Sequence, residues 1–86
     1  MNFKELKKIL EETEVLLKRK NQMYGDGNID SMGIEGVIFR ITEKIERIKH
    51  LIKTDQNPEE EPLEDSWKDI IGFGIIGLML KRNKWK

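Results

Sequence analysis

Apolar residues recur at helical spacing through most of the chain. In residues 2–24 and again in residues 33–53 they are three or four positions apart, and at about 100° per residue such positions fall on one face of an α-helix. Each segment is therefore predicted to be an amphipathic helix that buries this face. The stripe is most regular in the second segment, where it consists of Ile34, Val37, Ile38, Ile41, Ile45, Ile48 and Ile52.

Start and stop signals define three helices. Asn2 followed by Glu5 is typical of a capping box, and Gly25 is a residue type that commonly ends a helix. Pro62 suits the first position of a further helix, because the N–H group that proline lacks would be unpaired there. The sequence therefore predicts a single all-α domain over residues 1–86, with helices at 2–24, 33–53 and 62–82 and a polar linker at 54–61.

The third segment is apolar on all sides from Ile70 to Leu80 and contains Gly72, Gly74 and Gly77. Each glycine costs a helix up to about 1 kcal/mol relative to alanine, so the close approach of another backbone is needed to compensate. Two neighbouring helices do not suffice to surround such a segment. We therefore predict three helices in an antiparallel helical bundle that is completed by homo-oligomerisation, as a dimer or a tetramer.

The apolar run and the balance of charge bear on possible partners. The run spans 11 residues, far fewer than the roughly 20 needed to cross a bilayer, so a buried helix is favoured over a membrane segment. Association of this basic-ended helix with a membrane surface is a weaker alternative. The 16 basic and 16 acidic residues cancel, so neither a long nucleic acid nor a membrane is expected as a partner.

The composition also limits the available chemistry. The chain contains no cysteine and one histidine, which excludes zinc–thiolate sites and argues against a histidine-based metal site. A metal ion would have to be bound by oxygen ligands. The amino terminus is charged from its fourth residue and lacks the apolar core of a signal peptide, so a cytoplasmic location is expected.

Asp69 is the acidic residue whose position most needs an explanation. Asp65 lies in the first turn of the third helix, where the helix dipole favours a negative charge, but Asp69 lies one turn further on, against the apolar run. A carboxylate there loses hydration and requires a cation. The cation could be a lysine or arginine of the second helix, or a Mg²⁺ ion shared with Asp65 and Glu43.

Two further groups of polar residues have both a structural and a functional interpretation. Glu43 and Arg47 lie four residues apart in a charged strip of the second helix, which is the spacing of an ordinary surface ion pair. The stretch KNQMYGDGN, residues 20–28, contains two glycines and is typical of a helix stop followed by a turn. Lys20 and Tyr24, however, place a cation and an aromatic ring on one helical face, which suits a phosphate and a base.

Three segments, KNQMYG, RITEKIERI and EPLEDSWKDIIGFG, occur in this order on the three predicted helices. Together they resemble the small all-α nucleotide-modification-associated domains. That group is similar in turn to the all-α nucleoside triphosphate pyrophosphohydrolases, which include MazG-like and dUTPase-like helical enzymes. The resemblance covers residues 16–80 and implies a helical oligomer in which carboxylates from two helices hold Mg²⁺ against the phosphates of a nucleotide.

The resemblance also assigns roles to individual residues. It implies that Glu43 and Asp69 are catalytic, and that Glu43, Asp65 and Asp69 bind the metal. The acidic pattern departs from that of MazG-like enzymes, because Arg47 follows the pair Glu43 and Glu46 where a further acid is usual, and the acids of the third helix are four residues apart rather than three. The residues implied to bind the nucleotide are Lys20, Asn21, Tyr24, Gly25, Arg40, Lys44 and Arg47.

Two hypotheses from different classes follow. The leading one is a nucleotide-handling protein that binds a (deoxy)nucleoside phosphate with Mg²⁺ and, as a nucleoside triphosphate pyrophosphohydrolase, releases pyrophosphate. The alternative is a non-catalytic helical oligomerisation or interaction module, in which the third helix is an interface and the acids form ordinary ion pairs. Asp69 distinguishes the two, because only the first requires it for metal-dependent binding.

Overall fold

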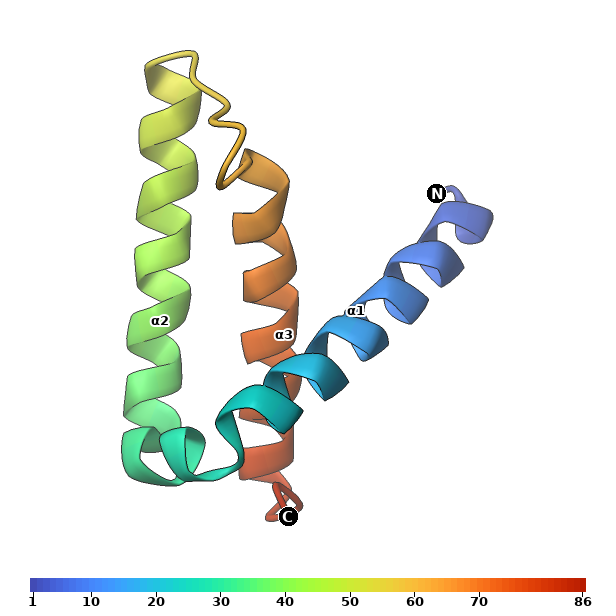
Figure 1. The fold of residues 1–86 in the computed structure, drawn as a ribbon, viewed down its shortest axis with the longest axis vertical. Coiled ribbons are helices and arrows are strands. Elements are labelled where there is room, and N and C mark those ends of the chain that lie inside the picture. The colour runs from blue at the N-terminus through green and yellow to red at the C-terminus, as the bar shows by residue number, and fades with distance from the viewer.

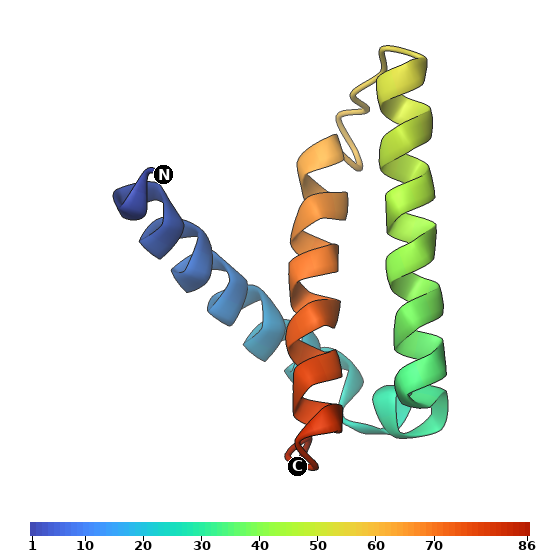
Figure 2. The same cartoon turned by 180° about the vertical axis from the view of Figure 1, so that it is seen from behind.

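The computed structural model describes residues 1–86 and consists of three helices without strands, α1 (Phe3–Tyr24), α2 (Gly27–Lys53) and α3 (Leu63–Lys81). The all-α prediction is confirmed. Helices α2 and α3 lie side by side and run in opposite directions, whereas α1 is inclined to both and crosses the second half of α3 (Figure 1). Seen from behind, the first half of α1 stands clear of the other two helices (Figure 2).

Helix α1 begins and ends at the predicted signals. The side-chain oxygen of Asn2 accepts a hydrogen bond of 3.0 Å from the backbone N–H of Glu5, which satisfies one of the unpaired donors of the first turn. At the other end Gly25 has a φ of 69°, a conformation that residues with a Cβ rarely adopt. Its N–H donates to the carbonyl of Asn21 at 2.7 Å.

Helix α2 begins at Gly27 rather than at residue 33. The glycine-rich stretch after α1 was predicted to form a turn, but it enters a short helical segment that ends at Gly33, where φ is 64° and ψ is −173°. The burial of Ile29, which is 3% exposed, explains the difference, because helical geometry turns this side chain into the interior. Gly33 therefore produces a kink inside α2, as breaks in a helix at glycine commonly do.

Helices α2 and α3 end in the same way. After α2 the residue Asp55 adopts a positive φ of 53°, and after α3 the residue Asn83 adopts a φ of 57°. In each case the next residue reaches back to the last turn: Lys84 N–H donates to the Met79 carbonyl at 2.8 Å. This is the Schellman arrangement, in which short polar residues replace the usual glycine. It reverses the chain direction after each helix.

The interior is small for a chain of this length. Seven of the 86 residues are buried, and the apolar ones are Ile29, Val37, Ile48 and Leu51. The predicted isoleucine stripe of α2 is split, because α3 covers only one side of it. The members of the stripe that stay exposed are Ile34, Ile38, Ile45 and Ile52.

The glycines of α3 differ in what they face. Gly72 is buried where α1 crosses, and a Cβ at this position would lie 3.2 Å from Cδ2 of Leu17. The neighbour at this crossing is thus a leucine side chain, and not the backbone whose close approach the sequence predicted. Gly74 faces open space. None of the three helices combines the length and the apolarity that a membrane-spanning helix needs.

Candidate functional site

A pocket of about 550 Å³ lies where the second half of α1, the start of α2 and the second half of α3 meet. We call it the α1–α3 pocket. Four residues predicted to bind a nucleotide, Lys20, Asn21, Tyr24 and Gly25, are among those that line it, together with Asp69. Its apolar lining includes Phe73, Ile76 and Met79 of α3.

Asp69 is held by lysines from two other helices. Its Oδ1 accepts a hydrogen bond from Lys20 Nζ of α1 at 2.9 Å, and its Oδ2 lies 3.0 Å from Lys44 Nζ of α2. The sequence left open whether the cation beside Asp69 is a basic side chain or a metal. In this structure it is a lysine of the second helix joined by a lysine of the first.

Burial and the two lysines act on Asp69 in opposite directions. Loss of hydration alone would raise the pKa of Asp69, but the hydrogen bonds and charges of Lys20 and Lys44 outweigh it and lower this pKa below its ordinary value of 3.8. The carboxylate is therefore ionised at neutral pH. The cluster of Lys20, Asp69 and Lys44 has one net positive charge, since two ammonium groups face one carboxylate.

The pocket as a whole also favours an anion. Three lysines and two aspartates line it: Lys18, Lys20, Lys68, Asp26 and Asp69. Lys20 is placed both to hold Asp69 and to contact a ligand, because its side chain is 45% exposed while it bonds Asp69. An ammonium group has three N–H donors, so Lys20 can donate to an incoming ligand without releasing the carboxylate.

Asn21 is held in place by a short local contact. Its amide Nδ2 donates to Oδ1 of Asp26 at 2.8 Å, across the turn at Gly25. This bond fixes the direction of the amide group and leaves its oxygen free to accept. The turn thus has the structural role that its glycine indicates, and it also orients a polar group at the pocket.

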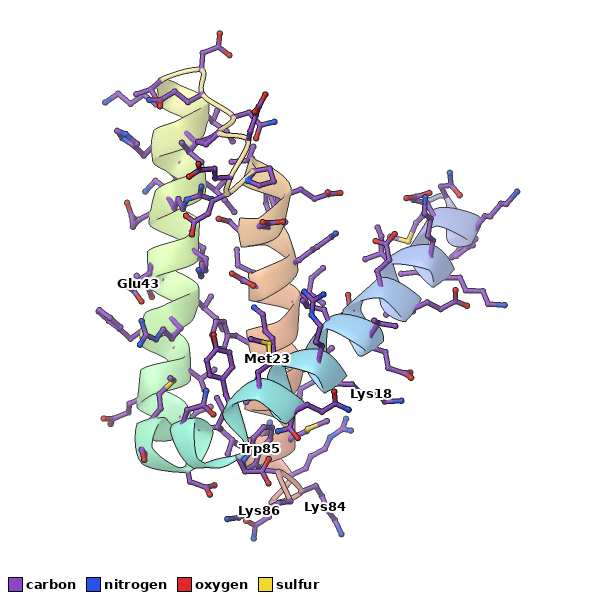
Figure 3. The ribbon with its side chains drawn as sticks, in the orientation of Figure 1. Lys18, Met23, Glu43, Lys84, Trp85 and Lys86 are labelled. Atoms are coloured by element: carbon purple, nitrogen blue, oxygen red, sulfur yellow. The ribbon has the colours of Figure 1, made fainter.

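Other predicted site residues lie outside the pocket. Arg40 and Glu43 form an exposed ion pair of 3.0 Å within α2. Figure 3 shows Glu43 on the side of α2 that is turned away from α3. Arg47 faces α3, but its guanidinium donates to Ser66 Oγ at 2.7 Å and to the Glu61 carbonyl, so it ties α2 to the linker and to the start of α3.

The three carboxylates predicted to hold Mg²⁺ are not brought together. Asp65 is exposed in the first turn of α3, Glu43 is paired with Arg40, and Asp69 is occupied by its two lysines. No group of three or more histidine, cysteine, aspartate or glutamate residues is placed to hold a metal ion. The side chains of one chain, in this arrangement, do not fit the predicted magnesium site.

Trp85 lines the pocket although the sequence did not indicate it. It follows the third helix and belongs to none of the motifs. The available signal was Asn83, a residue type that tolerates the left-handed region and can reverse the chain after a helix. Figure 3 shows Trp85 at the junction of the three helices, with Lys84 and Lys86 extending away from it.

Comparison with known proteins does not identify a relative. The sequence matches no protein-family model, and comparisons with characterised proteins and with solved structures gave no match. The resemblance of the three short segments to all-α nucleoside triphosphate pyrophosphohydrolases therefore stays a prediction.

Proposed function

We propose that this protein binds a nucleoside phosphate in the α1–α3 pocket. The observation that supports the proposal is the combination, in one pocket of about 550 Å³, of an apolar and aromatic lining with a net positive charge. Ligand pockets in proteins typically measure about 300 to 1,000 Å³ and join an apolar wall to a few oriented polar groups. A base suits the apolar wall, and phosphate oxygens suit the lysines.

The phosphate group would lie at Lys20. This side chain is partly exposed, and the Lys20–Asp69 bond of 2.9 Å holds its ammonium group at the pocket. Lys68 lines the same pocket and is only loosely paired, with its Nζ 3.8 Å from a carboxylate oxygen of Glu64. Hydrogen bonds from ammonium groups to phosphate are charge-assisted and about twice as strong as neutral ones.

The base would lie against the aromatic and amide groups. The ring of Tyr24 lines the pocket and is exposed enough to stack on a planar ligand. The oriented oxygen of Asn21 offers an acceptor for an amino or imino group of a base. These contacts use the loop residues that the sequence singled out, with Asp69 acting on the phosphate through Lys20.

Hydrolysis of a nucleotide requires catalytic groups beyond those that bind it. Since Glu43, Asp65 and Asp69 do not converge, the chain's own residues supply no acidic cluster from which a metal-assisted step could be built. Release of pyrophosphate with Mg²⁺ stays a prediction of the resemblance. Measuring every affinity both with Mg²⁺ and with a chelator tests it.

The test of binding is titration calorimetry with dATP, dGTP, dCTP and dTTP on the wild type, Lys20→Ala and Lys7→Ala. We expect Lys20→Ala to weaken binding about ten- to hundredfold, because one charge-assisted hydrogen bond contributes about 1.5 to 3 kcal/mol and about 1.4 kcal/mol corresponds to a factor of ten. Lys7→Ala removes an exposed lysine of α1 that does not line the pocket, and it should leave the affinity for each nucleotide unchanged.

Failure of all four nucleotides to bind, with or without Mg²⁺, would sink the proposal. Equal affinity in Mg²⁺ and in chelator would mean that the predicted metal has no part in binding. Affinity that requires Mg²⁺, together with pyrophosphate release, would show that the catalytic form of the hypothesis is correct and that the carboxylates rearrange or are completed by another chain.

A second observation favours self-association. Large apolar side chains are exposed on α1 and α2, including Phe3 at 72% and Ile52 at 63%. A second copy of the chain presents both faces at once, so a twofold arrangement could bury them in one step. We therefore also propose that a homo-oligomer completes the helical bundle.

A further inference from the structure

The segment after α3, residues 82–86, turns back on the helix. Asn83 in the left-handed region and the bond from Lys84 N–H to the Met79 carbonyl at 2.8 Å reverse the chain within two residues. Trp85 follows immediately and lines the α1–α3 pocket. The segment is therefore directed into the pocket by local backbone geometry.

An ion pair holds the last residue of the same segment. Lys86 Nζ lies 2.7 Å from Oδ2 of Asp30, which belongs to the first part of α2. The hydrogen bond to Asp30, and then its charge, raises the pKa of Lys86. Trp85 is thus fixed between the turn at Asn83 and this pair, and its position depends on residues other than those that hold Asp69.

The indole N–H of Trp85 has no hydrogen-bond partner although it is buried. Buried tryptophan N–H groups usually find an acceptor, since an unpaired buried donor has lost its bond to water without replacement. The ring around this donor lines a pocket. The N–H itself is covered in this arrangement, so an acceptor that enters the pocket supplies the missing bond once the indole ring turns toward it.

We infer that Trp85 is a specificity-determining residue that contacts the edge of the base of the bound nucleotide, with its in-plane N–H donating to a base acceptor. The inference rests on the proposed function and assigns the two ends of the ligand. Lys20 holds the phosphate, and Trp85 selects for a heteroaromatic group that has a nitrogen or oxygen acceptor. A phosphate compound without a base leaves Trp85 unsatisfied.

The chain allows a direct spectroscopic test. Trp67, the other tryptophan, is exposed on α3 and does not line the pocket, so Trp67→Phe leaves Trp85 as the single indole fluorophore. In this variant we expect the emission of Trp85 to change when a deoxynucleoside triphosphate binds. Inorganic tripolyphosphate, which has the phosphates without the base, should leave the emission unchanged. An equal change with tripolyphosphate would overturn the inference.

Affinity gives the second measurement. Trp85→Phe keeps an aromatic ring and removes the N–H, and it should weaken the tightest-binding nucleotide about tenfold, as expected for loss of a hydrogen bond from a buried donor. Trp67→Phe is the matched control and should bind like the wild type. Circular dichroism on both variants checks that the helices are intact.

The outcomes separate the inference from the function on which it rests. If the wild type binds a nucleotide and Trp85→Phe binds it equally well, Trp85 does not select the base, and the nucleotide pocket stands without it. If the wild type binds none of the four nucleotides, both the pocket's function and the role of Trp85 are wrong. Should Trp85→Phe fail to fold, the fluorescence titration of Trp67→Phe still decides, because it keeps Trp85.

Discussion

Asp69 joins the three helices at one point, because its two carboxylate oxygens are bound by lysines of α1 and α2. Its side chain is 17% exposed, which makes it the least accessible carboxylate among the ion pairs of the chain. Removing its charge would leave two ammonium groups facing each other with no counter-ion. The effect on stability should therefore exceed that of any surface pair.

We expect Asp69→Asn to lower the free energy of unfolding by about 1 to 2 kcal/mol, a value reduced from that of a fully buried pair because both lysines are partly exposed. For a domain of this size 1 kcal/mol corresponds to about 4 to 8 °C in melting temperature. Glu43→Gln, which breaks the exposed pair with Arg40, is the control and should cost less than about 1 kcal/mol. Equal melting temperatures for the two variants would contradict a special role for Asp69.

The difference in stability between the wild type and Asp69→Asn should depend on pH, because the pKa of Asp69 is lowered in the folded state. A carboxyl group with a lower pKa in the folded state stabilises the protein above its ordinary value of 3.8, and this contribution is lost as the pH falls through the folded-state pKa. The difference in melting temperature between wild type and Asp69→Asn should thus be constant near neutral pH. It should shrink at pH values below 3.8, in a series of thermal melts.

Sequence reasoning identified that Asp69 needs a cation and offered a basic residue of the second helix as one candidate, but it did not find the lysine of the first helix. Lys44 belongs to the predicted second helix and was a foreseeable partner. Lys20 lies 49 residues away along the chain, and it reaches Asp69 only because α1 crosses α3 near Gly72. The spacing of apolar residues within one helix does not indicate where another helix crosses it. The pocket that this crossing creates could therefore not be predicted either.

At the scale of elements, the helical segments were predictable, and so were all of their ends except the start of α2. Apolar spacing and capping residues located α1 and α3 to within a residue at each end, since these signals are local. The first turns of α2 were missed because Gly27 and Asn28 are typical of a turn, whereas the burial of Ile29 favours helix. The reversals at Asp55 and Asn83 use residues other than glycine, which makes them weaker signals.

The turn at Asn83 can be tested by substitution. Asn83→Gly should keep or slightly raise stability, because glycine adopts a positive φ without strain, whereas Asn83→Val places a β-branched residue at a φ of 57° and should cost about 1 to 2 kcal/mol. The valine variant should also release Trp85 from the pocket. Acrylamide quenching of Trp85, measured in a Trp67→Phe background, should increase for valine and stay unchanged for glycine.

At the scale of the molecule, the apolar surface exceeds what one copy can bury. Val37, Ile48 and Leu51 of α2 are buried, while the isoleucines on the neighbouring side of the helix are exposed. Exposed Ile38, Ile45 and Ile52 are seven residues apart and so form one line along the helix. A continuous apolar line of this length is more typical of an interface than of a solvent-facing surface.

We expect the wild type to sediment as a dimer or a tetramer at micromolar concentration, and the double variant Ile38→Glu with Ile45→Glu to sediment as a monomer with a lower melting temperature. His50→Glu adds a carboxylate to the side of α2 that carries Glu43, seven residues earlier, and should leave the assembly intact. A wild type that sediments as a monomer, with a melting temperature independent of concentration, would exclude the proposed oligomer.

The separation along the chain of the contacting residues has a consequence for the order of folding. Arg47 and Ser66, which join α2 to α3, are 19 residues apart, whereas Lys20 and Asp69 are 49 apart and Asp30 and Lys86 are 56 apart. Closing a longer loop costs more chain entropy before its contacts compensate. The α2–α3 hairpin should consequently form first, and α1 and the segment after α3 should dock on it last. The pocket is then the last part of the molecule to assemble on folding and the first to open when the native state fluctuates.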